Sequence, residues 1–153
     1  MNTMQHLIQL LHEGPHSLVL RSTDGRVHCY DGRGISDLLL LLQCEPRLLQ
    51  GAEAADKVVG KAAAALMIEG GVARVHADLV SQMALHLAES EAAGGGHRLQ
   101  LDYTATAPHI VNRQGDGWCP METACRDCAT ARESVESVRR KLKEMKEKNK
   151  EKK

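Results

Sequence analysis

The alanine-rich segment from residue 52 to residue 71 restricts the fold most strongly, because its small side chains suit close packing. Alanine has the highest helix propensity, and only Gly60 interrupts the segment before the pair Gly70-Gly71. We therefore expect one helix over residues 52–69 that ends at this glycine pair. The predicted buried stripe would let the helix lie close to a sheet and consists of Ala55, Val58, Val59, Ala62, Ala63 and Leu66.

The core of this 153-residue chain must be built from aliphatic side chains, because there is no Phe and the aromatic residues are Trp118, Tyr30 and Tyr103. The length suffices for one domain. The chain has no basic-then-apolar leader and no apolar run long enough to span a bilayer, so we expect a cytoplasmic protein without a membrane partner. Its five cysteines are then expected to be reduced.

Periodicity and turn residues predict the remaining elements. Helices are expected over 4–11, 36–42, 81–90, after 119 and from 130, and strands over 17–22, 27–30, 72–77 and 98–103. Asp24-Gly25 predicts a two-residue hairpin turn. This order predicts an α/β fold, a three-layer α/β/α sandwich with a mixed sheet over residues 1–128. A charged helical tail would follow over 129–153.

The net charge of zero conceals a basic tail on an acidic body. Residues 139–153 carry a charge of +6, so the rest of the chain carries −6. The tail is either a solvated helix or a short heptad stripe that docks on its own body or forms a homo-oligomer. Nucleic acid is the least favoured partner, because Glu residues interrupt the basic run and no aromatic side chain is available for stacking.

Two separate motifs carry a resemblance to a known family. They are ADKVVGKAAA at 55–64 and NRQGDGWCPME at 112–122, in this order and with a strand–helix–strand unit between them. The chain resembles the DUF1893 family of uncharacterised proteins, within the cytidine-deaminase-like superfamily, over residues 4–128. The resemblance implies a cytidine-deaminase-like fold in which the two motifs meet.

The same resemblance implies that the zinc ligands are absent. In zinc deaminases one helix supplies a His or Cys ligand and a catalytic Glu, and a second helix begins at a Pro-Cys-x-x-Cys motif. Here Lys61 stands at the ligand position and Ala63 at the catalytic position. The second motif keeps Cys119 and has Glu122 in place of the other thiol. We therefore expect no metal and no cofactor.

Cys119 is the first candidate for chemistry. Pro120 suits the first position of a helix, which would make Cys119 the N-cap, where free amides and the helix dipole favour a reactive thiolate. The resemblance would place the Lys61 ammonium opposite this thiol, and Glu122 could exchange a proton. We expect catalytic residues Cys119, Lys61 and Glu122 beside a small-molecule ligand such as a nucleotide-like compound, with cysteine-dependent catalysis or sulfur transfer.

Ligands of such sheets bind where strands end, and both motifs are expected there. The residues expected to contact the ligand are Asp56, Lys57, Asn112, Arg113, Gly115, Gly117 and Trp118.

The competing interpretation is a non-catalytic ligand-binding or protein-interaction module that retains only the fold. In that case Cys119 is a small core residue, and Lys61 and Glu122 form a structural ion pair. Cys125 and Cys128 have the spacing of half a metal site, or are two incidental thiols.

Overall fold

A five-stranded mixed sheet forms the centre of the protein, in the order β2-β1-β3-β4-β5. The computed structural model describes residues 3–32, 35–112 and 114–151, and the side chains of these residues up to 148. β1 pairs antiparallel with β2 and β3, whereas β3, β4 and β5 run parallel. The strands are β1 (Leu18–Arg21), β2 (Val27–Tyr30), β3 (Glu53–Val59), β4 (Arg74–Ser81) and β5 (Gln100–Ala107).

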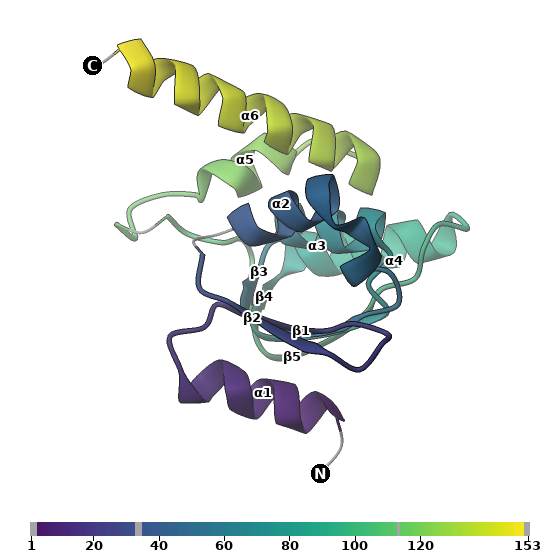
Figure 1. The fold of residues 1–153 in the computed structure, drawn as a ribbon. Coiled ribbons are helices and arrows are strands. Elements are labelled where there is room, and N and C mark those ends of the chain that lie inside the picture. Colours follow the sequence, from purple (N-terminus) through teal and green to yellow (C-terminus); the bar gives the residue numbers. More distant parts are fainter. Residues whose placement is uncertain (1–2, 33–34, 113, 152–153) are drawn as a thin grey trace.

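The described chain also contains six α-helices (Figure 1). They are α1 (Thr3–Glu13), α2 (Ser36–Cys44), α3 (Lys61–Gly70), α4 (Gln82–Ala93), α5 (Pro120–Cys125) and α6 (Ala131–Glu151), with a short 3-10 helix at Pro46–Leu48. The predicted mixed α/β class is confirmed. No helix among the described residues is both long and apolar enough to cross a bilayer.

The two faces of the sheet are covered by different helices (Figure 1). On one face, α1 buries Met4, Leu7 and Leu11, spaced at i, i+3 and i+7, against Val19 of β1 and Ala55 of β3. On the other face lies α3, in which every residue except Glu69 is buried. Alternate residues of β1 and β3, such as Leu18 and Ala54, face the larger core on the α3 side.

The prediction of a single helix over 52–69 is wrong in its first half. Residues 53–59 form the central strand β3, and α3 begins only at Lys61, after the extended N-cap Gly60. β3 pairs with β1 on one side and β4 on the other, and its alanines let helices approach both faces closely. Sheet pairing thus overrides the helix propensity of alanine. The predicted end of the helix is confirmed, because Gly71 is a left-handed C-cap with φ 81°.

The hairpin between β1 and β2 has a three-residue loop instead of the predicted two. Ser22 pairs with Arg26, and the Gly25 amide donates to the Ser22 carbonyl, so Thr23 and Asp24 are the central residues of the turn. Gly25 then adopts φ 89°, the left-handed position that completes this loop type.

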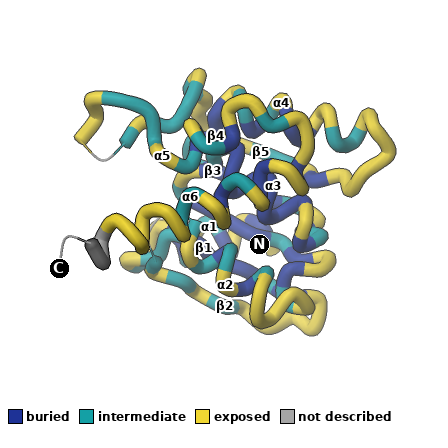
Figure 2. The backbone as a smooth tube through the Cα atoms, turned by 90° about the horizontal axis from the view of Figure 1, so that it is seen from above, coloured by how far each residue is buried: buried dark blue, intermediate teal, exposed yellow. Residues whose placement is uncertain are grey.

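Helix α6 is part of the core at its beginning and exposed at its end (Figure 2). The Thr130 hydroxyl accepts from the Glu133 amide at 3.1 Å, which caps the helix start. Ala131, Val135 and Val138 are buried. The residues that extend beyond the body therefore begin after Leu142, well inside the segment 129–153.

Candidate functional site

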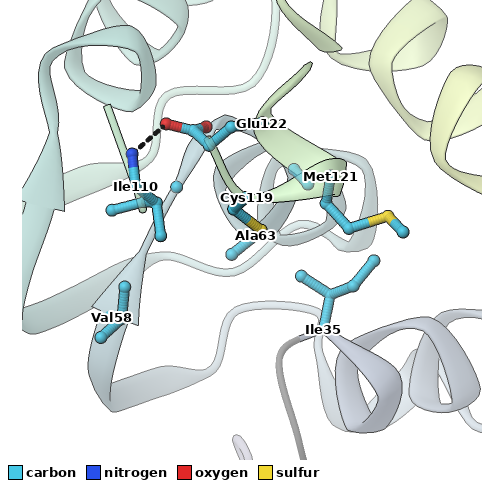
Figure 3. Close-up of a pocket in the computed structure, with 9 residues that line it drawn as sticks. Ile35, Val58, Ala63, Ile110, Cys119, Met121 and Glu122 are labelled. Carbon is cyan, nitrogen blue, oxygen red and sulfur yellow. Dashed lines mark hydrogen bonds between the residues drawn. The ribbon is translucent and has the colours of Figure 1, made fainter. Parts of the chain in front are cut away.

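A small cavity lies where the start of α3 meets the start of α5, at the carboxyl end of β3 (Figure 3). Its volume is about 90 Å³. The walls are mostly apolar, and the thiol of Cys119 and the carboxyl group of Glu122 are its polar side chains. The lining residues are Ile35, Val58, Gly60, Ala62, Ala63, Ile110, Cys119, Met121 and Glu122.

The Glu122 carboxylate joins α5, which carries it, to two other segments of the backbone. Only 2% of this residue is exposed. One oxygen accepts from the Lys61 amide at 2.5 Å, and the other accepts from the Ile110 amide at 3.0 Å. The Lys61 amide is one of the free donors at the beginning of α3, so Glu122 acts as a helix cap supplied by another element. Both oxygens of the carboxylate are therefore committed to holding the cavity walls together.

Gly60 allows this carboxylate to approach. A Cβ atom at position 60 would lie 2.9 Å from Glu122 Oε1 and 3.0 Å from Ile110 Cγ1. The Glu122 carboxylate cannot withdraw easily, because both of its oxygens accept hydrogen bonds from backbone amides. The glycine is needed here for space.

The Lys61 side chain, which was expected to activate the Cys119 thiol, binds backbone carbonyls between α5 and α6 and does not line the cavity. Its ammonium donates to the carbonyl of Cys128 at 2.5 Å and, more weakly, to that of Arg126 at 3.4 Å. The residue is 7% exposed. Among the described residues, the ion pairs include none between Lys61 and Glu122, whose contact runs through the Lys61 amide instead. Lys61 therefore secures the turn between α5 and α6.

Cys119 occupies the predicted N-cap of α5 and is partly exposed. Its amide donates to the Ile110 carbonyl at 2.8 Å, and its carbonyl accepts from the Thr123 amide at 3.0 Å. In Figure 3 its sulfur lies beside Ala63, whereas Met121 extends toward Ile35. The thiol thus faces an apolar wall at the cavity.

Comparison with known proteins identifies the family of the chain. The family described as "TM1506: Domain of unknown function (DUF1893)" matches residues 6–142. The chain belongs to the DUF1893 family. The match extends past residue 128 into α6, which fits the buried beginning of that helix.

The fold of this DUF1893 protein is similar to a solved structure from the same family. The crystal structure of a DUF1893 family protein (TM1506) from Thermotoga maritima matches with a TM-score of 0.77 and 22% identity over 92% of each chain. At this identity the similarity concerns the fold. The search of curated proteins found no match.

The loop before Cys119 closes on itself in this DUF1893 protein. The Asn112 Nδ2 group donates to the Asp116 carboxylate at 2.8 Å, and the backbone amide of Asp116 donates to Asn112 Oδ1 at 3.2 Å. The backbone amide of Asn112 donates to the Gly117 carbonyl. Gly115 supplies the left-handed position with φ 75°. Trp118 stacks on His109 with ring centroids 4.1 Å apart.

Of the predicted ligand residues in this loop, those that the structure describes do not line the cavity. The loop residues Asn112, Gly115, Gly117 and Trp118 contact one another or their neighbours instead. Arg113 lies outside the described residues.

Asp56 and Lys57, also predicted to contact the ligand, lie in β3 away from the cavity lining. Asp56 is 8% exposed, and its carboxyl accepts from the Val58 amide at 3.3 Å. Burial raises the pKa of Asp56 to about 7, and the nearby charge of Asp78 adds to the increase. Asp56 is therefore a buried acid of the sheet that titrates near neutral pH.

Cys125 and Cys128 pack against α6. Cys125 is fully buried and donates to the Ser134 carbonyl at 3.6 Å, while Cys128 lies 3.3 Å from the Ser137 hydroxyl. Burial raises the pKa of Cys125 to about 12, with a further contribution from Cys128. No group of three or more His, Cys, Asp or Glu side chains in the described residues is arranged to hold a metal ion.

Several lining residues were not predicted from the sequence. Ile35, Ile110 and Met121 give no signal, because isolated apolar residues are found in every core. Ala62 and Ala63 were predicted to be buried against a sheet, yet they line the cavity, and Ala63 occupies the motif position that carries the catalytic Glu in zinc deaminases. A small side chain at this motif position was therefore the sequence signal that could have identified these two alanines as lining residues.

Proposed function

We propose that this protein binds a small molecule, with an apolar portion, in the α3–α5 cavity beside the Cys119 thiol. The observation that carries the proposal is the composition of the cavity wall, where one partly exposed thiol stands among apolar side chains at the end of a parallel strand. Pockets of this kind, apolar with few polar groups, are typical of ligand sites in such sheets.

We further propose a zinc-independent member of the cytidine-deaminase-like superfamily with a three-layer sandwich fold, acting in the cytoplasm. In support, the starts of α3 and α5, the two places where zinc deaminases hold their metal, meet at one cavity. Lys61 and Ala63 replace the ligand and the proton shuttle, and the Glu122 carboxylate is occupied by two backbone amides. These side chains fit a zinc ion poorly, so the chemistry left to the site is that of the thiol.

A second candidate function is reversible binding without catalysis. It is favoured by the hydrogen bonds of Lys61 and Glu122, which hold both groups in structural roles and leave Cys119 without a positioned proton acceptor among the described side chains. The two candidates share the cavity. They differ in whether ligand and thiol react.

Alkylation of Cys119 by a small apolar electrophile, N-benzyl chloroacetamide, tests the proposal. The rate, followed by peptide mass spectrometry, should saturate with reagent concentration at Cys119, because the benzyl group first occupies the cavity. At the exposed thiol of Cys44 in the same molecule the rate should rise linearly. Ala63→Leu should abolish saturation by filling the cavity, whereas Glu69→Leu, on the exposed side of α3, should preserve it. Linear rates at both thiols, unaffected by Ala63→Leu, would refute ligand binding there.

A further inference from the structure

A second recess lies between α2 and α6, away from the α3–α5 cavity. Its volume is about 260 Å³, and it is lined by Leu39, Gln43, Arg139, Leu142, Lys143 and Lys146. We call it the α2–α6 groove. Helix α2 lies beneath α6 in Figure 1, so the groove has one helix on each side.

The charge of the groove is of one sign. Arg139, Lys143 and Lys146 follow one another at i, i+4 and i+7, so they lie on one face of α6. Among the described residues, the lining contains no acidic side chain. None of the ion pairs formed by the described residues includes these three cations, and the ion pair found within α6 joins Arg132 and Glu136. Three like charges on one helix face repel one another unless an anion lies between them.

The floor of the groove is apolar. Leu39 of α2 and Leu142 of α6 are partly buried and pack against the core clusters. Their remaining exposed surface faces the groove, next to the amide of Gln43. A ligand that places an anionic group on the cations and an apolar body on the leucines would satisfy both parts of the lining.

The distribution of charge over the chain favours this groove as an anion site. The segment 139–153 carries +6 and the remainder −6, so an anion is repelled by the body and attracted to α6. The volume of about 260 Å³ is close to the lower limit for small-molecule pockets, which selects a compact ligand.

We propose that the α2–α6 groove binds a small phosphomonoester with an apolar body. A phosphate group at neutral pH carries close to two negative charges and three acceptor oxygens, which match one guanidinium and two ammonium groups better than a carboxylate does. The site is independent of the Cys119 cavity.

Calorimetric titration of the full chain at low salt, with phenyl phosphate as the probe, tests this inference. Phenyl phosphate should bind saturably and at least about tenfold more tightly than inorganic phosphate, which has no apolar body, or benzoate, which has one charge. Equal affinity for phenyl phosphate and inorganic phosphate would overturn the role of the leucines. Equal affinity for benzoate would overturn the phosphate assignment.

Two triple variants with the same net charge distinguish binding in the groove from a general effect of charge. Arg139→Gln, Lys143→Gln and Lys146→Gln together should weaken phenyl phosphate binding by about tenfold or more. Arg140→Gln, Lys141→Gln and Lys148→Gln remove the same charge from residues outside the lining and should change it by less than about twofold. Equal losses in both triple variants, or no saturable binding by the wild type, would refute the site. Ala63→Leu, in the α3–α5 cavity, should leave this affinity unchanged. A failure to bind phenyl phosphate would therefore refute the groove site and not the proposed ligand site at the cavity.

Discussion

The α3–α5 cavity and the α2–α6 groove differ in what their polar groups do. At the cavity, the side chains of Glu122 and Lys61 are buried and bind backbone groups, so they hold the fold together. At the groove, the cations of Arg139, Lys143 and Lys146 are exposed and have no acidic partner among the described residues. A charged side chain beside a recess is thus available to a ligand only when it is not already bound to other groups of the protein.

Removal of the Glu122 side chain, at the cavity, should lower the free energy of unfolding most. Glu122→Ala leaves the amides of Lys61 and Ile110 without their acceptor, and we expect a loss of about 3 to 5 kcal/mol in the free energy of unfolding. Urea denaturation measures this loss. Glu144→Ala, at an exposed position of α6, is the control and should cost less than about 0.5 kcal/mol. A similar small cost for both variants would show that Glu122 does not hold the walls.

The buried carboxyl of Asp56 extends the comparison to the sheet. Its pKa is raised to about 7 in the folded protein from an ordinary value of 3.8, so the folded state holds a proton that the unfolded state releases. Stability must then fall as pH rises from about 4 to about 7, and stay level with respect to this group above pH 7. Asp56→Asn removes the dependence.

Unfolding free energies measured across this pH range check the prediction. The stability of Asp56→Asn relative to wild type should increase between pH 4 and pH 7 by on the order of 3 kcal/mol. Asp127→Asn, at an exposed position, should show a flat difference. A flat difference for Asp56→Asn as well would mean that its carboxyl ionises as freely as one in water.

A smaller effect is expected at Gly60, where the Glu122 carboxylate leaves no room for a side chain. Gly60→Ala should lower the free energy of unfolding by about 1 to 2 kcal/mol. In the Glu122→Ala background the same substitution should cost less, because the main obstacle has been removed. Strictly additive costs in this double-mutant cycle would show that the two residues do not share the constraint.

The smallest effect is predicted at the groove. The triple substitution of Arg139, Lys143 and Lys146 by Gln should change the free energy of unfolding by less than about 0.5 kcal/mol per residue, because exposed charges contribute little to stability. Chemical denaturation in low salt measures it. A larger loss would place these cations in the fold, as Glu122 and Lys61 are, and would remove the contrast between the two regions.

Much of the fold could be predicted from local sequence patterns. The α1 stripe, the Ser81 cap of α4, the Gly71 end of α3 and the N-cap position of Cys119 all depend on residues a few positions apart. β3 could not, because Ala54 and Ala55 have a strand conformation only through pairing with β1 and β4.

The site was predictable in position but not in detail. The two motifs do meet, at the cavity that Cys119 and Glu122 line. The role of Lys61 depends on the carbonyl of Cys128, which is 67 residues away and belongs to a turn without a sequence signature. Any residue type can supply a backbone carbonyl, so a hydrogen bond of this kind cannot be predicted from the sequence.

We propose that the thiol of Cys119 is the chemically available group of the cavity, because Lys61 is committed to the α5–α6 turn. The most direct test is the rate of Cys119 alkylation by iodoacetamide in Lys61→Met, compared with wild type by peptide mass spectrometry. We predict rates within about twofold of each other, because the ammonium binds the Cys128 and Arg126 carbonyls and not the thiol. A tenfold or larger decrease at Cys119, with the rate at Cys44 unchanged, would contradict the account and restore Lys61 as the activating group.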